Sequence, residues 1–208
     1  RAERVLATFE QRAGNTGVMM SGEKGSGKTL LVKHIATEAL KRGISVVQID
    51  GKSPNIAATA DYLAKSDASL VVVFDEFEKI IGRDDQVHLL SLLDGLGATK
   101  HLFLLSSNSA RVDARMMNRP GRIYYYFEYG ALEEAFVREY VTDHLKDKSL
   151  IEKLCESLKV FRCLNFDIMS AVVQEMNRYN ESPLQAMSWL NASPAFEDSS
   201  GYRMKAFV

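Results

Sequence analysis

The sequence predicts an α/β fold in which helices flank a five-stranded parallel sheet and a small all-helical domain follows. Two observations favour this fold class. Short runs of β-branched and aromatic residues alternate with helical patterns up to residue 129, and such alternation is typical of a parallel sheet covered on both faces. From Gly130 onward the strand-like runs stop and four helical segments follow. With 208 residues, the chain is long enough for one α/β domain and a small appendage.

Five runs are expected to form the strands of the sheet. Each is short, β-branched or aromatic, and mostly apolar, as expected of strands that are buried on both faces. The five runs are residues 17–21, 44–49, 69–75, 101–107 and 122–128. Parallel strands are joined by crossover connections, which are usually helical, so helices are expected between the runs.

The intervening segments carry helical patterns. The stretch KTLLVKHIATEALKR follows the first strand and ends at Gly43, a typical C-terminal cap of a helix. Its apolar residues are expected to share one buried face: Leu30, Leu31, Ile35 and Leu40. Residues 56–66 and 85–96 fill the next two gaps. Ahead of the first strand, a short helix is expected to pack on the core through Val5, Leu6 and Phe9.

The second part of the chain is expected to be helical. Four segments with helical patterns cover residues 131–145, 149–158, 165–179 and 182–191. The last begins with Ser182 as N-cap and Pro183 as its first residue, and Trp189 is expected to pack inside this domain. The sequence therefore predicts three parts, namely an α/β core over residues 1–129, a helical lid over 130–191 and a tail over 192–208.

Composition and charge narrow the function classes. The formal net charge is −1, so no overall basic field indicates a nucleic-acid partner, and a local basic patch stays open as an alternative. The longest apolar run, residues 70–74, is far too short to span a bilayer, so no membrane partner is expected. Cys155 and Cys163 fit neither a disulfide framework nor a metal pair. A cytoplasmic protein with reduced thiols is expected.

The sequence GEKGSGKT, residues 22–29, has the spacing of a phosphate-binding loop, and it lies between a predicted strand and a predicted helix. Its glycines let successive backbone N–H groups turn toward phosphates. Lys28 should reach the β- and γ-phosphates, and the Thr29 hydroxyl should hold Mg²⁺. A glycine-rich turn without a ligand explains the glycines but not the Lys-Thr pair. ATP is the expected cofactor, bound by Gly22, Glu23, Lys24, Gly25, Ser26, Gly27, Lys28, Thr29 and Leu30.

Two carboxylates follow the apolar run of the third predicted strand. Asp75 is expected to position Mg²⁺ beside Thr29, and Glu76 is expected to act as the general base that polarises the attacking water. The alternative is a solvated turn at the end of a strand. Glu78 and Lys79 are interpreted as surface residues. An adjacent Asp-Glu pair favours hydrolysis of the nucleotide over a switch that merely holds it.

Three further pieces complete an ordered set. The sequence HLLSLLDGL covers residues 88–96, Asn108 ends the fourth predicted strand, and RPGR covers residues 119–122. With the phosphate loop and the Asp-Glu strand, this set resembles the AAA-clade ATPases of the AAA+ superfamily. The resemblance covers residues 17–128 strongly and residues 165–176 weakly. It implies a P-loop NTPase core with a small C-terminal helical lid, and it implies that Asn108 orients the attacking water.

The resemblance also assigns roles to arginines. In rings of this family, Arg119 and Arg122 would reach into the nucleotide site of a neighbouring subunit and stabilise charge on the transferred phosphoryl group. Arg115 is the substitute candidate. The alternative is that these arginines are salt-bridged surface residues after a turn. If the arginines act across an interface, the active unit is an oligomer, and a closed hexamer is expected by resemblance.

The expected function is that of an ATPase whose ring couples hydrolysis to the remodelling of a macromolecule. Expected partners are further copies of the chain and a protein substrate or adaptor, with nucleic acid as the alternative. Threading members of the family carry an aromatic pore motif where this chain has residues 50–63, which have no aromatic residue before Tyr62. Lys52 and Asn55 are the residues expected to face a pore. A surface loop is the alternative there. Two other functions stay open: a DNA-directed AAA+ ATPase of the helicase-loader or nuclease-partner type, and a nucleotide-gated assembly scaffold.

Overall fold

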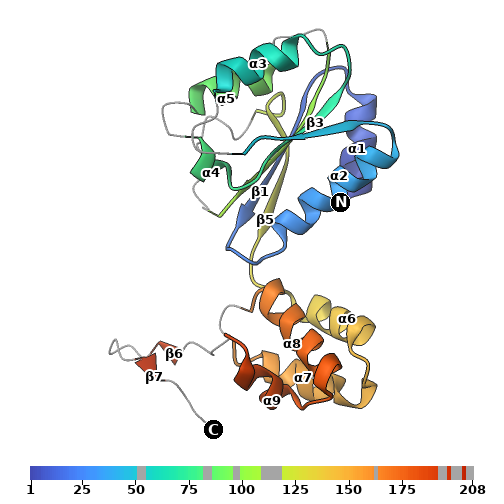
Figure 1. Cartoon of the computed structure of the whole chain (residues 1–208), viewed down its shortest axis with the longest axis vertical. Coiled ribbons are helices and arrows are strands. Elements are labelled where there is room, and N and C mark those ends of the chain that lie inside the picture. Colours follow the sequence, from blue (N-terminus) through green and yellow to red (C-terminus); the bar gives the residue numbers. More distant parts are fainter. Residues whose placement is uncertain are drawn as a thin grey trace. The chain divides into compact units, whose positions relative to one another are not determined.

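The computed structural model describes most of the chain, in the ranges 1–50, 55–81, 86–95, 99–108, 119–161, 164–191, 196–197 and 203–204. By its internal contacts the chain forms two compact units (Figure 1). The first unit comprises Arg1–Glu23 and Lys28–Tyr129. The second comprises Gly130–Val208 together with the short stretch Lys24–Gly27. The first unit contains the central sheet, and the second is mainly helical.

The first unit is built on a five-stranded parallel sheet, which confirms the predicted fold class. Its strands are β1 (Thr16–Gly22), β2 (Ser45–Gln48), β3 (Leu70–Phe74), β4 (Leu102–Ser107) and β5 (Ile123–Tyr129), in the spatial order β2-β3-β4-β1-β5. Because all strands run the same way, their carboxyl ends meet at one edge of the sheet and their amino ends at the opposite edge. The segments that follow β1, β3 and β4 therefore lie at the same edge.

Helices cover both faces of the sheet (Figure 1). Side chains alternate along β1, so that Val18 and Met20 face one helical layer and Met19 faces the other. One layer contains α1 (Ala2–Gln11) and α2 (Lys28–Lys41). The other contains α3 (Ile56–Ala64), α4 (Phe77–Ile80) and α5 (Gln86–Asp94). Because both faces of the sheet are covered by apolar contacts with helices, a polar site can form only at the ends of the strands.

The helix α1 packs on the core as predicted, with Val5, Leu6 and Phe9 buried. The ammonium group of Lys100 caps its C-terminal end, because Nζ donates hydrogen bonds to the carbonyls of Phe9, Glu10 and Arg12 at 2.9, 2.8 and 2.7 Å. A cation is favourable there, since the last carbonyls of a helix lack intrahelical donors.

The predicted buried face of α2 is wrong at two positions. Leu30 and Leu40 have exposed fractions of 55% and 59%, and the buried apolar residues are Val32, Ile35 and Ala39. The physical reason lies at the start of the helix, where the Lys28 side chain is buried. Residues 28, 32, 35 and 39 recur at helical spacing, so burial of Lys28 turns that stripe toward the sheet and leaves Leu30 and Leu40 in solvent.

In its described residues, the second unit has four α-helices with a core of their own. They are α6 (Glu134–His144), α7 (Ile151–Leu158), α8 (Phe166–Tyr179) and α9 (Pro183–Trp189). The side chain of Asn165 caps α8 by accepting a hydrogen bond from the Ile168 N–H at 2.9 Å. Trp189 is 75% exposed, so the expectation that it packs inside this domain is wrong. Two two-residue strands, β6 (Phe196–Glu197) and β7 (Arg203–Met204), pair antiparallel near the C-terminus.

Of the two cysteines, Cys155 is buried and free, and burial raises the pKa of its thiol. Cys163 lies outside the described residues. Among the helices that the structure describes, each is too short or too polar to cross a membrane.

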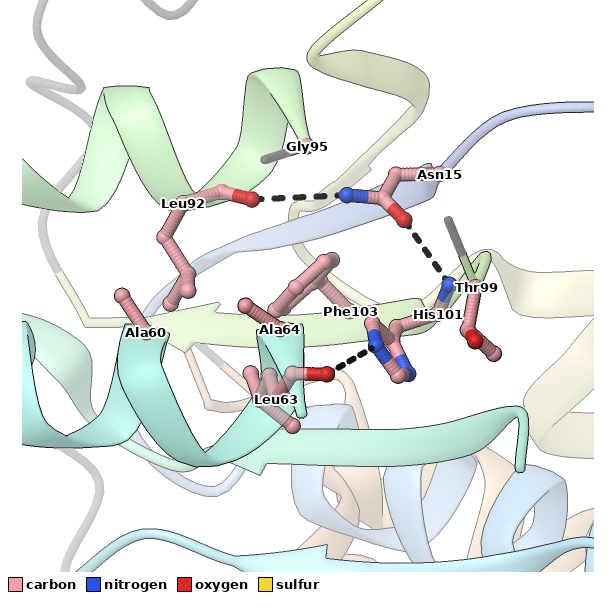
Figure 2. Close-up of a pocket in the computed structure, with 9 residues that line it drawn as sticks. All are labelled: Asn15, Ala60, Leu63, Ala64, Leu92, Gly95, Thr99, His101 and Phe103. Atoms are coloured by element: carbon pink, nitrogen blue, oxygen red, sulfur yellow. Dashed lines mark hydrogen bonds between the residues drawn. The ribbon is translucent and has the colours of Figure 1, made fainter. Parts of the chain in front are cut away.

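A buried histidine joins three elements at the amino-end edge of the sheet (Figure 2). The Leu70 N–H donates to His101 Nδ1 at 3.3 Å, so that nitrogen carries no proton. His101 Nε2 lies 3.2 Å from the Leu63 carbonyl and is the donor in that pair. Burial lowers the pKa of His101, and these contacts suit a neutral ring. The cavity beside it is about 10 Å³, which leaves room for at most one water molecule.

We expect the free energy of unfolding to fall as the pH drops below about 6.5, the ordinary pKa of histidine. In that range the unfolded chain binds a proton at His101 while the folded chain, whose His101 pKa is lowered, does not. Stability that is present above the ordinary pKa is lost as the pH falls toward the folded pKa. Urea unfolding between pH 5 and 8 checks this. The variant His101→Gln should make the free energy of unfolding depend less on pH. His144→Gln, which changes an exposed histidine, is the control.

Candidate functional site

The segment after β1 has the backbone of a tight glycine loop. Gly22, Gly25 and Gly27 have φ values of 146°, 78° and 95°, which L side chains rarely adopt. A Cβ at Gly22 would lie 2.2 Å from the Tyr129 carbonyl oxygen, so β5 closes on the loop there. A Cβ at Gly27 would have nothing within 4 Å, so space is open beside that residue. The loop is thus shaped by its backbone, as a phosphate cradle requires.

Lys28, the first residue of α2, is 4% exposed, and its ammonium group lies over the loop. Its Nζ donates hydrogen bonds to the carbonyls of Gly22 and Glu23, both at 2.7 Å. A buried ammonium held by backbone carbonyls is a fixed positive charge that an anion can approach. The N–H groups at the start of α2 add the positive end of the helix dipole. The ammonium group of Lys28 therefore lies beside the loop, where it could contact a bound anion.

Thr29 and Asp75 come together as predicted from their order in the sequence. The Thr29 hydroxyl lies 3.3 Å from both carboxylate oxygens of Asp75. A hydroxyl and a carboxylate side by side are hard oxygen donors, the kind that Mg²⁺ prefers, and Mg²⁺ usually keeps several of its waters and takes only one or two protein ligands. The residues present at this point fit a magnesium ion.

Ser106 is a site residue that the sequence did not reveal. Its hydroxyl donates a short hydrogen bond to Asp75 Oδ1 and accepts one from the Glu76 N–H at 2.8 Å. In the register of the sheet, Phe74 is paired with Leu105, so the next residues, Asp75 and Ser106, lie side by side. The only signal in the sequence was a hydroxyl residue near the end of a strand. That signal points to the site only if β3 and β4 are known to be neighbours in the sheet.

Glu76 has a strained backbone, with φ 54° and ψ 50° in the left-handed region. For a residue other than glycine this conformation costs on the order of 1–2 kcal/mol, and such strain persists where the surrounding structure holds it. One carboxylate oxygen of Glu76 accepts a short hydrogen bond from the Asn108 amide, and the other pairs with Lys79 Nζ at 2.6 Å. The two predicted residues, Glu76 and Asn108, are therefore in direct contact.

Lys79 is exposed, as predicted for a surface residue, whereas Glu78 is half-buried. Glu78 Oε1 accepts a hydrogen bond from the Asn108 N–H at 2.8 Å, while its Oε2 is buried without a hydrogen-bond partner. The hydrogen bond between Lys79 and Glu76 raises the pKa of Lys79. Asn108 thus bridges two carboxylates, with its backbone bound to Glu78 and its side chain bound to Glu76. The pair of Lys79 and Glu76 is local in the sequence, whereas the contact of Glu78 with Asn108 depends on the strand β4 lying beside this segment.

The middle of the glycine loop belongs to the second compact unit. Within that unit, the Gly25 carbonyl accepts hydrogen bonds from the N–H groups of Phe166 and Asp167 at 2.9 and 3.3 Å. Ser26 is 7% exposed, whereas Lys24 is exposed. The Leu30 side chain is also exposed, so only its backbone is left as a means of binding ATP. The first turn of α8 is thus anchored on a residue of the predicted phosphate loop.

Arg119 and Arg122 lie at the opposite edge of the sheet from the residues above. They directly precede β5, and β5 runs parallel to β1 with Gly17 paired to Ile123 and Gly22 paired to Tyr129. The two pairs are five residue steps apart along β1 and six apart along β5, which corresponds to about 17–20 Å along the sheet. Neither arginine can therefore reach the phosphate loop of its own chain. Arg119 is exposed, and Arg122 pairs with Asp94.

Arg115 and Lys52 lie outside the described residues. Asn55, expected to face either a pore or solvent, caps α3, because its Oδ1 accepts a hydrogen bond from the Ala58 N–H at 2.9 Å.

Comparison with known proteins decides the family. Residues 18–129 match the model of the "ATPase family associated with various cellular activities (AAA)", and this range is more than half of the chain. The chain belongs to the AAA family of ATPases. The matched range contains Lys28, Asp75, Glu76 and Asn108, whose side chains the structure brings to one edge of the sheet. The predicted resemblance is confirmed.

Curated relatives agree with this assignment. The chain is 27% identical over 152 residues to Protein CdcH of Halobacterium salinarum, a match covering 64% of this chain and 20% of the relative. It is 26% identical over 156 residues to the 26S proteasome regulatory subunit 6B homolog of Schizosaccharomyces pombe, covering 65% of this chain and 40% of the relative. Over 168 residues it is 27% identical to the Peroxisomal ATPase PEX6 of Rattus norvegicus, a match covering 71% of this chain and 17% of the relative. The chain thus spans less than half the length of these relatives.

Proposed function

We propose that this AAA-family chain hydrolyses ATP in sites shared between neighbouring copies of itself. The observation that carries the proposal is the separation of its predicted residues between two edges of one sheet. Lys28, Glu76 and Asn108 lie at the carboxyl ends of the strands, whereas Arg119 and Arg122 lie at the amino-end edge. A group about 17–20 Å from the loop of its own chain can act only on a nucleotide held by another chain.

At the carboxyl-end edge, each residue has a role that its contacts support. Lys28 and the loop N–H groups would hold the β- and γ-phosphates, and Thr29 with Asp75 would hold Mg²⁺ through oxygen atoms and water. A magnesium ion held by these two residues would supply positive charge beside the phosphates. Glu76 would accept the proton of the attacking water, and the Asn108 amide would orient Glu76 and that water.

At the other edge, Arg119 would supply positive charge to the γ-phosphate of the neighbouring copy. A heterologous contact in which one edge of each copy faces the other edge of the next generates a closed ring when the rotation closes. We propose such a ring, a hexamer by resemblance to the family, with a bound macromolecule as the substrate that it remodels. A protein substrate is favoured over nucleic acid because the net charge of −1 provides no general basic field.

The proposal predicts that ATP turnover per chain rises with protein concentration over the range in which light scattering reports assembly. A shared site is complete only in the oligomer, so dilution should lower the specific activity while a fluorescent ATP analogue still binds. Full turnover by a monomer would contradict the proposal. Stimulation by DNA, rather than by a protein, would indicate the DNA-directed function, and assembly with nucleotide but with negligible turnover would indicate a scaffold.

A further inference from the structure

Arg122 is held within its own chain by a two-pronged ion pair. Its Nε donates to Asp94 Oδ1 and one terminal nitrogen donates to Asp94 Oδ2, both at 2.6 Å. This geometry uses the planar fork of arginine against both oxygens of a carboxylate, the strongest arrangement of such a pair. The hydrogen bond lowers the pKa of Asp94 and raises that of Arg122. The Arg122 side chain is only 14% exposed.

The backbone of Arg122 is fixed as closely as its side chain. The Arg122 N–H donates to the Arg119 carbonyl at 2.8 Å, and the Ile123 N–H donates to the same carbonyl at 3.1 Å. The Arg122 carbonyl packs directly on Gly17, where a Cβ would come within 2.0 Å of its oxygen. The turn of residues 119–122 is thus closed on Arg119 and anchored to β1 and β5.

The other member of the pair is anchored as well. Asp94 is the last residue of α5, and the Asn15 amide donates to the carbonyls of Leu92 and Leu93, both at 3.3 Å, which caps that end of the helix. Asn15 Oδ1 accepts a hydrogen bond from the His101 N–H at 2.8 Å (Figure 2). Because Asn15 directly precedes β1, the end of α5 is tied to the starts of β1 and β4.

We propose that Asp94 and Arg122 are positioning residues that fix the turn of residues 119–122, and that Arg119 is the arginine that reaches the neighbouring nucleotide. Arg122 would have to give up two charge-assisted hydrogen bonds to leave Asp94. Arg119, in contrast, is exposed and lies at the start of the anchored turn. The inference rests on the proposed shared site and divides the roles of the two arginines.

Steady-state ATP turnover of the full chain tests the inference through Asp94→Asn, which keeps the size of the side chain and removes its charge. A loosened turn misplaces Arg119, so kcat should fall on the order of 10–10²-fold, the range expected of about 1 Å of misplacement. KM for ATP should stay unchanged, because the chain's own phosphate loop is untouched. Arg122→Lys, which keeps the charge but loses the fork, should behave alike, and Asp94→Glu should recover part of kcat.

The decisive measurement is the double variant Asp94→Asn with Arg119→Ala. If Asp94 acts only through Arg119, the double variant is no slower than Arg119→Ala alone. The matched control is Glu152→Gln, which breaks the two-pronged pair of Arg138 and Glu152 on the second unit and should leave kcat unchanged. Thermal unfolding of each variant checks that the fold is retained.

The outcomes separate the two proposals. Normal turnover of Asp94→Asn and Arg122→Lys, with slow turnover of Arg119→Ala, overturns the positioning role and leaves the shared site standing. Additive losses in the double variant also overturn the positioning role, because Asp94 would then act independently of Arg119. Normal turnover of Arg119→Ala overturns the assignment of Arg119, and full turnover by a monomer overturns the shared site itself.

Discussion

Replacing Arg119 with alanine is expected to slow ATP turnover on the order of 10³–10⁵-fold, the range that arginine fingers contribute to phosphoryl transfer. Arg119 is exposed and lies at the amino-end edge of the sheet, so its removal leaves the chain's own loop, Lys28 and Glu76 intact. Binding of ATP should therefore be retained while the chemical step is lost. Single-turnover hydrolysis and titration with a fluorescent ATP analogue measure these two quantities separately.

Mixing of variants distinguishes a shared site from a local defect. An Arg119→Ala chain still carries Glu76, and a Glu76→Gln chain still carries Arg119, so a contact between the two rebuilds one complete site. At equal amounts and random assembly, roughly a quarter of the sites should be complete if each contact is heterologous. Arg138→Ala, at another exposed arginine, serves as the control and should be normal alone. Absence of rescue in mixed assemblies would show that Arg119 serves its own chain or none.

The fold and the central residues of the site could be predicted because they are encoded locally. The spacing of Gly22, Gly27, Lys28 and Thr29 fixes a loop between a strand and a helix, whatever surrounds it. Asp75 follows a short β-branched run that is typical of a buried strand. These features depend on neighbours in the sequence, and the parallel order then brings Asp75 to Thr29, as the distance of 3.3 Å shows.

The remaining site residues could not be predicted because they depend on which strands and helices become neighbours. Ser106 matters only because β4 lies beside β3, and the pair of Asp94 and Arg122 joins residues 28 positions apart. Glu78 reads as a surface carboxylate until the Asn108 N–H is placed against it. The prediction of the buried face of α2 was wrong for a related reason, because the burial of Lys28 determines which side of the helix faces the sheet.

Replacing Glu76 with glutamine should lower hydrolysis on the order of 10²–10⁴-fold, the usual contribution of a general base. Glutamine has the same size and keeps an oxygen that can accept the hydrogen bond from the Asn108 amide. It loses the negative charge that pairs with Lys79 and the ability to accept a proton from water. ATP should therefore bind but persist unhydrolysed, which chromatography of the nucleotide bound after one hour would reveal.

A second substitution separates the loss of a base from a general disturbance of this edge. Glu78→Gln changes a carboxylate two residues away that holds the Asn108 backbone, and its amide oxygen can accept the same hydrogen bond. We expect Glu78→Gln to retain most of the turnover that Glu76→Gln loses. Equal losses in the two variants would mean that the acidic cluster acts as a whole and that Glu76 is not the base. A selective loss in Glu76→Gln would instead assign the uptake of the proton from water to the Glu76 carboxylate.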